Sequence, residues 1–312
     1  MRNEFLSTSF LAKVKLCLYV FKIIRKAIHN SPLTIHNLKL TIIMKTILIS
    51  GASKGFGRAW AEAFLAKGYK VAATARNIDT LADLKAQYGD AILPLKLDVN
   101  NRAESLAVVE KVHQHFGTID ILINNAGYAL NGAVEEASEQ EARAQFETNF
   151  FGTLWLTQAV LPIMRKQQSG HIIQVSSILG ITTLPNLGLY NASKFAVEGL
   201  TETLSQEVKQ FGINVTLVEP NGYFTDIWGN TFNSKPIDAY DGLKKAIAEG
   251  HDPDTFGQTS ATVPAIIKLV EAENPPLRLF LGKVALPFAK HAYEQKLATW
   301  EEWNDVSVAA HG

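Results

Sequence analysis

Short runs of branched apolar residues recur along the chain, separated by longer stretches in which apolar residues return at helical spacing. The short runs have the length of buried strands, and the longer stretches have the period of amphipathic helices. Because the Val, Ile and Leu residues of the runs are continuous, the pattern is typical of a parallel sheet that is covered on both faces. Seven strands are predicted, at 45–50, 70–75, 91–97, 119–124, 171–176, 213–218 and 277–281.

The stretches between the strands predict helices at 57–67, 79–88, 101–116, 138–167, 189–211 and 261–273, and 283–303 predicts one more. Strands and helices therefore alternate over 44–312, which indicates an α/β fold with a seven-stranded, mainly parallel sheet and helices on both faces. The short connections favour a single doubly wound domain. One long irregular stretch, rich in Gly, Asn, Asp and aromatic residues, is predicted to form a substrate lid at 221–260.

Charge and cysteine content exclude several classes of protein. The chain has 30 basic and 30 acidic residues, so bulk charge does not indicate a nucleic-acid partner. Its one cysteine, Cys17, excludes a disulfide framework, and no Cys/His spacing predicts a metal site. A reducing compartment fits this composition, and we predict a cytoplasmic location.

Residues 1–43 differ from the rest of the chain, because they hold seven Lys or Arg residues and one acid, Glu4. Their longest apolar run, Leu16 to Phe21, is far shorter than the ~20 residues that span a bilayer. One interpretation is a basic amphipathic helix that lies on an anionic membrane. The interpretation that we favour is a non-catalytic extension, or a start upstream of the native one, before a domain that begins at Met44.

A glycine-rich turn follows the first predicted strand and leads into a helix: Ser50-Gly51-Ala52-Ser53-Lys54-Gly55-Phe56-Gly57. Backbone N–H groups at a helix start bind anions, and glycine lets the backbone approach a phosphate without a Cβ in the way. In this position the turn predicts a dinucleotide phosphate site. A plain glycine-rich turn is the alternative.

Tyr190 and Lys194 lie four residues apart in a predicted helix, so their side chains share one face. A neighbouring cation favours the phenolate of a tyrosine, whose ordinary pKa is about 10. The pair therefore predicts acid–base chemistry on an alcohol or a ketone. Alone it is weak evidence, since chance supplies such pairs on many helix surfaces.

Several motifs in order make the chain resemble the short-chain dehydrogenase/reductase family over 44–282. They are the Gly-x-x-x-Gly-x-Gly turn, Asn124-Asn125-Ala126-Gly127 after the fourth strand, Asn149, and Ser177 thirteen residues before Tyr190. The resemblance implies a Rossmann-type fold and an NAD(P)-dependent oxidoreductase that acts on CH–OH groups, similar to hydroxysteroid or retinol dehydrogenases or to carbonyl reductases. Hydride transfer would belong to the cofactor.

The resemblance also implies catalytic roles. Tyr190 would exchange a proton with the substrate oxygen, which Ser177 would hold. Lys194 would lower the pKa of the tyrosine and bind the nicotinamide ribose, and Asn149 would hold a water that links Lys194 to solvent. Of the two adjacent serines, Ser176 would face away from the site, because side chains alternate along a strand.

Cofactor choice is predicted by the end of the second strand. NAD sites have an acidic residue there for the ribose 2′-hydroxyl, and NADP sites use a cation for the 2′-phosphate. Here Arg76 follows the strand without an acid, and Lys54 stands in the glycine turn, so NADP(H) is predicted over NAD. The implied cofactor-binding residues are Gly51, Ser53, Lys54, Gly55, Phe56, Gly57, Arg76, Asp98, Val99, Asn125, Ala126, Gly127, Tyr190, Lys194, Pro220 and Thr225.

The segment after the sixth strand departs from the family pattern and carries the substrate prediction. Asn221 stands where the family usually has glycine, and asparagine tolerates unusual backbone angles. The predicted substrate-binding residues are Ser177, Leu179, Tyr190, Tyr223 and Trp228. Further candidates for the pocket lining are Tyr128, Ile178, Leu184, Phe224 and Phe232.

This mostly apolar set predicts a lipophilic ketone, aldehyde or alcohol as the small-molecule partner. Two other functions stay open: a membrane-associated lipid-modifying enzyme anchored by 1–43, and a nucleotide-sensing protein, which would typically have lost the tyrosine or the lysine. The resemblance implies a homo-oligomer, built on helices such as 138–167 and 189–211. The helix at 283–303 would complete the pocket or an interface.

Removal of residues 1–43 is predicted to leave folding and activity intact, because every motif above lies after Met44. The thermal unfolding midpoint and the turnover of the shortened and full chains would be compared. A shortened chain that fails to fold would show that the extension belongs to the domain.

Overall fold

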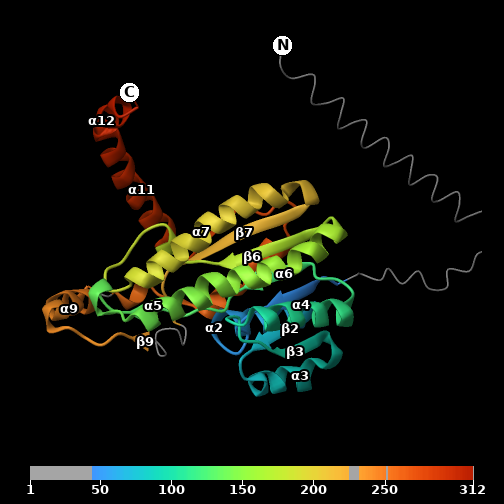
Figure 1. Cartoon of the computed structure of the whole chain (residues 1–312). Helices are drawn as coiled ribbons and strands as arrows, with labels where there is room; N and C mark the ends of the chain where they lie inside the picture. The colour runs from blue at the N-terminus through green and yellow to red at the C-terminus, as the bar shows by residue number, and fades with distance from the viewer. Residues whose placement is uncertain (1–43, 225–231, 251, 312) are drawn as a thin grey trace, which may run out of the picture. The chain divides into compact units, whose positions relative to one another are not determined.

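The predicted strands form one sheet in the computed structural model, which describes residues 44–224, 232–250 and 252–311. All seven run parallel, in the order β11-β7-β6-β4-β1-β2-β3 (Figure 1). The prediction of a doubly wound α/β fold is thus confirmed. The strands are β1 (Thr46–Ile49), β2 (Lys70–Ala75), β3 (Ile92–Lys96), β4 (Ile121–Asn124), β6 (Gly170–Val175), β7 (Ile213–Pro220) and β11 (Arg278–Leu281).

The order of the strands reverses between β1 and β4, and in open parallel sheets ligands bind outside the carboxyl ends of the strands at such a point. Residues 44–312 form one compact unit. Predictions that concern 1–43, Thr225 or Trp228 lie outside the described residues.

Alternating side chains of the strands divide the core into two layers. Ile47 and Ile49 of β1 face one layer, with α2 (Gly55–Ala66), α3 (Ala82–Tyr88) and α10 (Val263–Glu271). Leu48 faces the other, with α4 (Arg102–Phe116), α6 (Gly152–Gln167) and α7 (Gly188–Val208). Because both faces are covered, the strands are apolar throughout, as their sequence pattern indicates.

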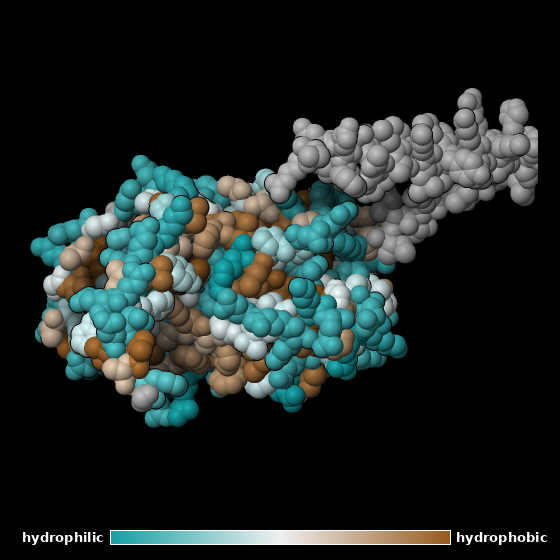
Figure 2. Space-filling view, turned by 90° about the horizontal axis from the view of Figure 1, so that it is seen from above, coloured by the Kyte–Doolittle hydropathy of each residue, from teal (hydrophilic) through white to brown (hydrophobic). Residues whose placement is uncertain are grey.

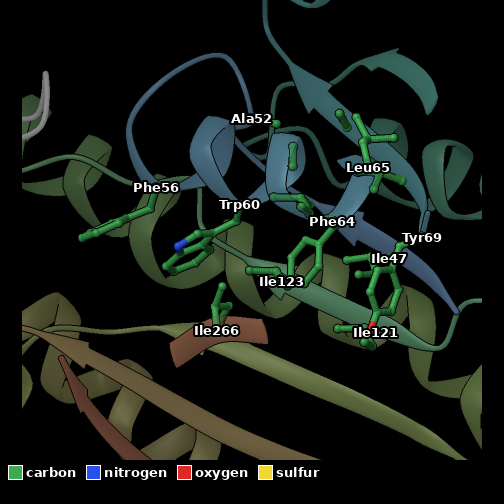
Figure 3. Close-up of a cluster of buried hydrophobic side chains, with 14 of the residues drawn as sticks. Ile47, Ala52, Phe56, Trp60, Phe64, Leu65, Tyr69, Ile121, Ile123 and Ile266 are labelled. Carbon is green, nitrogen blue, oxygen red and sulfur yellow. The ribbon is translucent and has the colours of Figure 1, made fainter. Parts of the chain in front are cut away.

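Trp60 of α2 lies at the centre of the first layer and is fully buried (Figure 3). Its ring stacks on Phe56 with centroids 5.2 Å apart, and its Nε1 donates to Oγ1 of Thr262, before α10, at 2.8 Å. This contact secures α2, the helix that begins at the glycine turn.

The prediction of one continuous α-helix at 138–167 is wrong, because the helix is interrupted. The structure has α5 (Glu139–Phe146), a π-helical turn at Glu147–Phe151, and then α6. The turn contains Asn149. A π-turn adds one residue to the helical spacing, and such turns are frequent at functional sites. The apolar periodicity of the sequence does not show this local insertion.

The stretch 221–260 contains more regular structure than the sequence predicts. It includes α9 (Asp241–Glu249), and β8 (Tyr223–Phe224) pairs with β10 (Gly257–Gln258). A second short pair joins β5 (Leu130–Asn131) to β9 (Phe232–Asn233). Two-residue strands are too short for any periodic signal, and the nine residues of α9 stand among Gly, Asp and Pro residues that indicate a loop.

The predicted C-terminal helix is present as α11 (Ala285–Glu302), followed by α12 (Asn304–Ala309). Figure 1 shows α11 extending away from the sheet. Hydrophilic and scattered hydrophobic residues mix on the face seen in Figure 2. Among the residues that the structure describes, no helix has the length and apolar character required to cross a membrane.

Thr262→Val should destabilise the fold by about 1–3 kcal/mol, because the buried Trp60 N–H loses its acceptor while the side-chain volume is kept. Urea unfolding would measure the loss. Thr203→Val is the matched control, since its hydroxyl bonds only to the carbonyl of Gly199 on an exposed helix face. Equal stability of the two variants would contradict this account of Trp60.

Candidate active site

The carboxyl ends of β1 and β4 are joined by a network of side-chain hydrogen bonds. Asn125 donates through Nδ2 to the carbonyls of Ser50 and Gly51, each at 3.0 Å. The Ser50 hydroxyl accepts from the backbone N–H groups of Asn125 and Ala126, at 3.0 and 3.1 Å. Polar backbone groups are thereby satisfied where the two strands part. The network fixes the floor of the glycine turn.

The glycine turn is closely packed against this network. Gly51 has φ of +69°, and a Cβ there would lie 2.9 Å from Cα of Ala126. A Cβ on Gly57 would lie 2.4 Å from the carbonyl oxygen of Gly51 and 2.5 Å from Nδ2 of Asn125. Both positions therefore require glycine.

The start of α2 has no side-chain cap and no acid in its first turn. Its N–H groups and the positive end of the helix dipole are thus available to an anion. Gly55, with φ of +58°, and Phe56 line the cavity described below, whereas Ser53 lies in the turn before them.

The two predicted cofactor cations come from loops that lie side by side. The N–H of Ala52 in the glycine turn donates to the carbonyl of Thr74 in β2 at 2.8 Å, which joins the turn to the end of that strand. Lys54 and Arg76 follow these two points, and both side chains are exposed. The two cations therefore stand on neighbouring loops at this edge of the sheet.

Asp98 and Val99 follow β3 and have local partners. The carboxylate of Asp98 accepts the N–H of Asn100 at 3.1 Å. Val99 is buried against Gly152, where a Cβ would lie 2.8 Å from Cγ2 of the valine. Neither residue lines the cavity, so they form the turn beside the predicted cofactor site.

Ser177, Tyr190 and Lys194 meet at the carboxyl end of β6. Tyr190 and Lys194 lie one turn apart on α7, as their spacing predicts, with Nζ of the lysine 5.7 Å from the centroid of the phenol ring. Ser177 follows β6, accepts the N–H of Leu179 at 3.1 Å, and hydrogen-bonds to the Tyr190 hydroxyl. Ser176 also borders the cavity, but its hydroxyl has no partner among the described residues.

Burial raises the pKa of the Tyr190 phenol, and its hydrogen bond to Ser177 opposes this shift. The expectation that Lys194 lowers the pKa of the phenol stays a prediction, since the raised pKa has burial as its main cause. The ammonium lies over the ring, and it donates at 2.9 Å to the carbonyl of Val175 at the end of β6. The phenol therefore carries its proton at neutral pH, as a proton donor must.

Burial also lowers the pKa of Lys194, from 10.5 to about 8, while the charge of Glu198 opposes the shift. Between these two values the unfolded chain binds more protons than the folded one at this residue. The buried charge of Lys194 therefore lowers the free energy of unfolding by its full amount below about pH 8. This destabilisation disappears as the pH rises from about 8 to 10.5.

Asn149 is buried, and its side-chain amide hydrogen-bonds to both the backbone N–H and the backbone carbonyl of Tyr128. Oδ1 accepts the N–H of Tyr128 at 3.1 Å, and Nδ2 donates to its carbonyl at 3.0 Å and to the Ser193 hydroxyl at 3.1 Å. A Cβ on Gly127 would lie 3.2 Å from Oδ1 of Asn149 and 3.8 Å from Nζ of Lys194. The π-turn thus brings Asn149 to the loop beside the lysine.

A buried ionic cluster behind Lys194 was not predicted from the sequence. Arg278 of β11 pairs with Glu198 of α7, with Glu219 of β7 at 2.6 Å and with Glu202 at 3.3 Å. Burial and the charge of Glu198 raise the pKa of Glu219. One sequence signal was available: Glu198 follows Lys194 by four residues and so lies on the same helix face.

Asn221 is used in a different way from the one that the sequence suggests. It does not have a positive φ. Its side-chain Nδ2 donates to the carbonyls of Gly222 and Thr255, at 3.0 and 2.8 Å. Its backbone N–H donates to the carbonyl of Leu281 at 2.9 Å. Asn221 therefore ties the segment after Pro220 to the 252–255 loop and to the end of β11.

A cavity of about 1160 Å³ opens beside these groups. Of the predicted cofactor and catalytic residues, it is lined by Gly55, Phe56, Asn125, Gly127, Ser177, Tyr190, Lys194 and Pro220. Of the predicted substrate residues, it is lined by Tyr128, Ile178, Leu179, Leu184, Tyr223 and Phe224.

The prediction that Phe232 lines the cavity is wrong, because Phe232 is not among the lining residues. Its exposed ring packs edge-on against Tyr128, with the ring centroids 4.9 Å apart. Lining residues that the sequence did not indicate include Asn186, Leu187, Ile247, Phe256, Val284 and Phe288. They come from segments far apart in the sequence. Val284 and Phe288 confirm that the C-terminal helix helps to complete the pocket.

Comparison with known proteins gives consistent matches. A family model described as short chain dehydrogenase matches residues 45–236. A 3-ketodihydrosphingosine reductase of Bacteroides thetaiotaomicron is 38% identical over 256 residues, covering 78% of this chain and 90% of that protein.

Two solved structures extend the likeness to the fold. A short-chain dehydrogenase from Streptomyces avermitilis is 37% identical with a TM-score of 0.78, covering 86% of this chain and 99% of its own. ElxO with NADP bound is 27% identical with a TM-score of 0.66, covering 78% of this chain and 99% of its own.

Glu198→Gln should lower the pKa of Lys194 below about 8, because it removes the carboxylate that opposes the effect of burial. Titration of the lysine Nζ by NMR would measure the change. Glu202→Gln is the matched control, since Glu202 contacts the same arginine from a half-exposed position. An unchanged pKa in Glu198→Gln would show that the two charges are not coupled.

Proposed function

Because the chain belongs to the short chain dehydrogenase family, we propose that it is an NADP(H)-dependent oxidoreductase that interconverts a lipophilic ketone or aldehyde and its alcohol. One observation carries the proposal: Ser177, Tyr190 and Lys194 converge on one wall of a cavity whose other walls are mostly apolar. Such a cavity holds a small apolar ligand beside a proton donor.

The residues at the switch point of the sheet fit a dinucleotide. Gly51 and Gly57 leave no room for a Cβ, and the uncapped start of α2 offers N–H groups to a pyrophosphate. Lys54 and Arg76 would bind the 2′-phosphate, and no acid stands at the end of β2 to favour NAD. The NADP bound to ElxO supports the same choice.

Tyr190 is the proposed proton donor to the substrate oxygen in the reductive direction. The bound cofactor would supply the hydride, and the protein supplies position and electrostatics. Since burial keeps the phenol protonated, it can give its proton to the oxygen as negative charge develops there. Ser177, which hydrogen-bonds to the same phenol, can hold that oxygen in place.

Lys194 is proposed to stabilise the phenolate that remains and to bind the ribose hydroxyls. Its ammonium is already held by the Val175 carbonyl, beside the Tyr190 ring. Asn149 has both polar groups of its side chain occupied by protein atoms, so we propose that it positions the Tyr128 loop at the site. A water held by Asn149 stays a prediction.

The lining of the cavity supports a lipophilic substrate. Its lining includes the large apolar or aromatic residues Leu179, Leu184, Tyr223, Phe224, Phe256 and Phe288. The arginine in the lining, Arg58, is bound to Glu62 and Asp83 and is not free to take a carboxylate. The name of the Bacteroides relative, 3-ketodihydrosphingosine reductase, fits a ketone with an apolar chain.

NADPH oxidation against a panel of carbonyl compounds is expected to be fastest with long-chain or polycyclic apolar ketones and aldehydes. The reason is that the cavity offers apolar contact and, among its described lining residues, no free arginine. The panel would include small charged keto acids, whose kcat/KM values would be compared with those of the apolar compounds. Higher kcat/KM for the charged set would contradict the substrate class, and no oxidation with any carbonyl would contradict the proposed reaction.

Arg76→Glu should weaken NADPH binding about ten- to hundredfold, because an ionic hydrogen bond worth about 1.5–3 kcal/mol becomes a repulsion. NADH binding should change little. Calorimetry with both nucleotides would measure the two effects, and Arg143→Glu, an exposed arginine on α5, is the matched control. Tighter binding of NADH than of NADPH by the unmodified protein would contradict the predicted preference.

A further inference from the structure

Within the described part of the chain, α11 contacts the rest of the domain only along part of its length. Ala285, Ala289 and Ala292 are buried, and Nζ of Lys296 donates to the carbonyl of Ile181 at 2.9 Å. Beyond that point the helix extends outward (Figure 1), and Trp300 is 60% exposed. A helix that projects alone is marginal in water. Trp300 is one of several large side chains exposed on this helix, and contiguous exposed apolar patches mark interaction sites.

Four large side chains form a line along the exposed side of α11, which we name the α11 stripe: Leu286, Tyr293, Leu297 and Trp300. They are separated by seven, four and three residues, the spacing of a coiled-coil seam. At about 100° per residue they fall within about 60° of one another. So narrow a line fits a second helix better than a flat surface.

The charges beside the stripe change sign along the helix. From Ala285 to Tyr293 the charged residue is Lys290, whereas Glu294, Glu301 and Glu302 follow, with Lys296 directed toward the domain. Two copies of α11 side by side in parallel would place like charges together. Two antiparallel copies of α11 would instead place the basic N-terminal half of each helix against the acidic C-terminal half of the other.

We propose that α11 pairs with α11 of a second copy of this chain, antiparallel, stripe against stripe, with Lys290 beside Glu301 of the partner subunit. Lys290 and Glu301 are eleven residues apart, which is about three full helical turns. Their directions around the helix axis therefore differ by only about 20°, so both lie on the same flank of the stripe. A two-fold axis then makes this contact twice. The pairing does not depend on the reaction proposed above.

A charge swap in the full chain tests the pairing. Sedimentation velocity over a range of concentrations should show that Lys290→Glu and Glu301→Lys each raise the dissociation constant about tenfold or more. The double variant should return it to within about threefold of the unmodified protein. Glu302→Lys is the matched control: it makes the same charge change one residue away, where the side chain points off the stripe, and should have little effect.

Leu297→Glu, at a half-exposed position, should abolish the same association step without lowering the thermal unfolding midpoint. The proposal is overturned if the unmodified chain is monomeric at all concentrations, if Glu301→Lys and Glu302→Lys behave alike, or if the double variant stays as weak as the single ones. It is also overturned if a monomeric chain binds phosphatidylcholine vesicles and Leu297→Glu abolishes that binding, since the stripe would then contact a membrane.

Discussion

The candidate active site is built around the cost of burying one ammonium ion. An isolated charge in a protein interior is strongly unfavourable unless other groups compensate it. Lys194 has three: the Val175 carbonyl, the Tyr190 ring and the charge of Glu198. Glu198 is held in turn by Arg278, which also binds Glu219 at the end of β7. Burial of the lysine thereby links α7, β6, β7 and β11 in one electrostatic unit.

The parallel sheet determines where this unit can stand. Its strands end together at one edge, where backbone groups lose their strand partners and side chains replace them. Asn125 and Ser50 do so between β1 and β4, and Asn221 does so after β7. Each of these polar ties also places a loop that borders the cavity, so the stability of the edge and the shape of the site have the same cause.

Much of this arrangement could be predicted from the sequence, because it depends on local signals. Continuous apolar runs marked all seven strands, and the spacing of Tyr190 and Lys194 placed both on one helix face. Contacts between distant segments could not be predicted in this way. The π-turn at Asn149, the pairing of Tyr223–Phe224 with Gly257–Gln258, and the Arg278 cluster each depend on residues that have no periodic signal.

The central claim is that Tyr190 gives the proton to the substrate oxygen while Lys194 stays behind it as a buried cation. Single-turnover hydride transfer from NADPH, measured with Tyr190→Phe against the unmodified protein, tests it most directly. The account predicts a loss of about 10²–10⁴-fold in the transfer rate, the usual contribution of a positioned acid, with NADPH affinity nearly unchanged. Transfer at the full rate in Tyr190→Phe would contradict it.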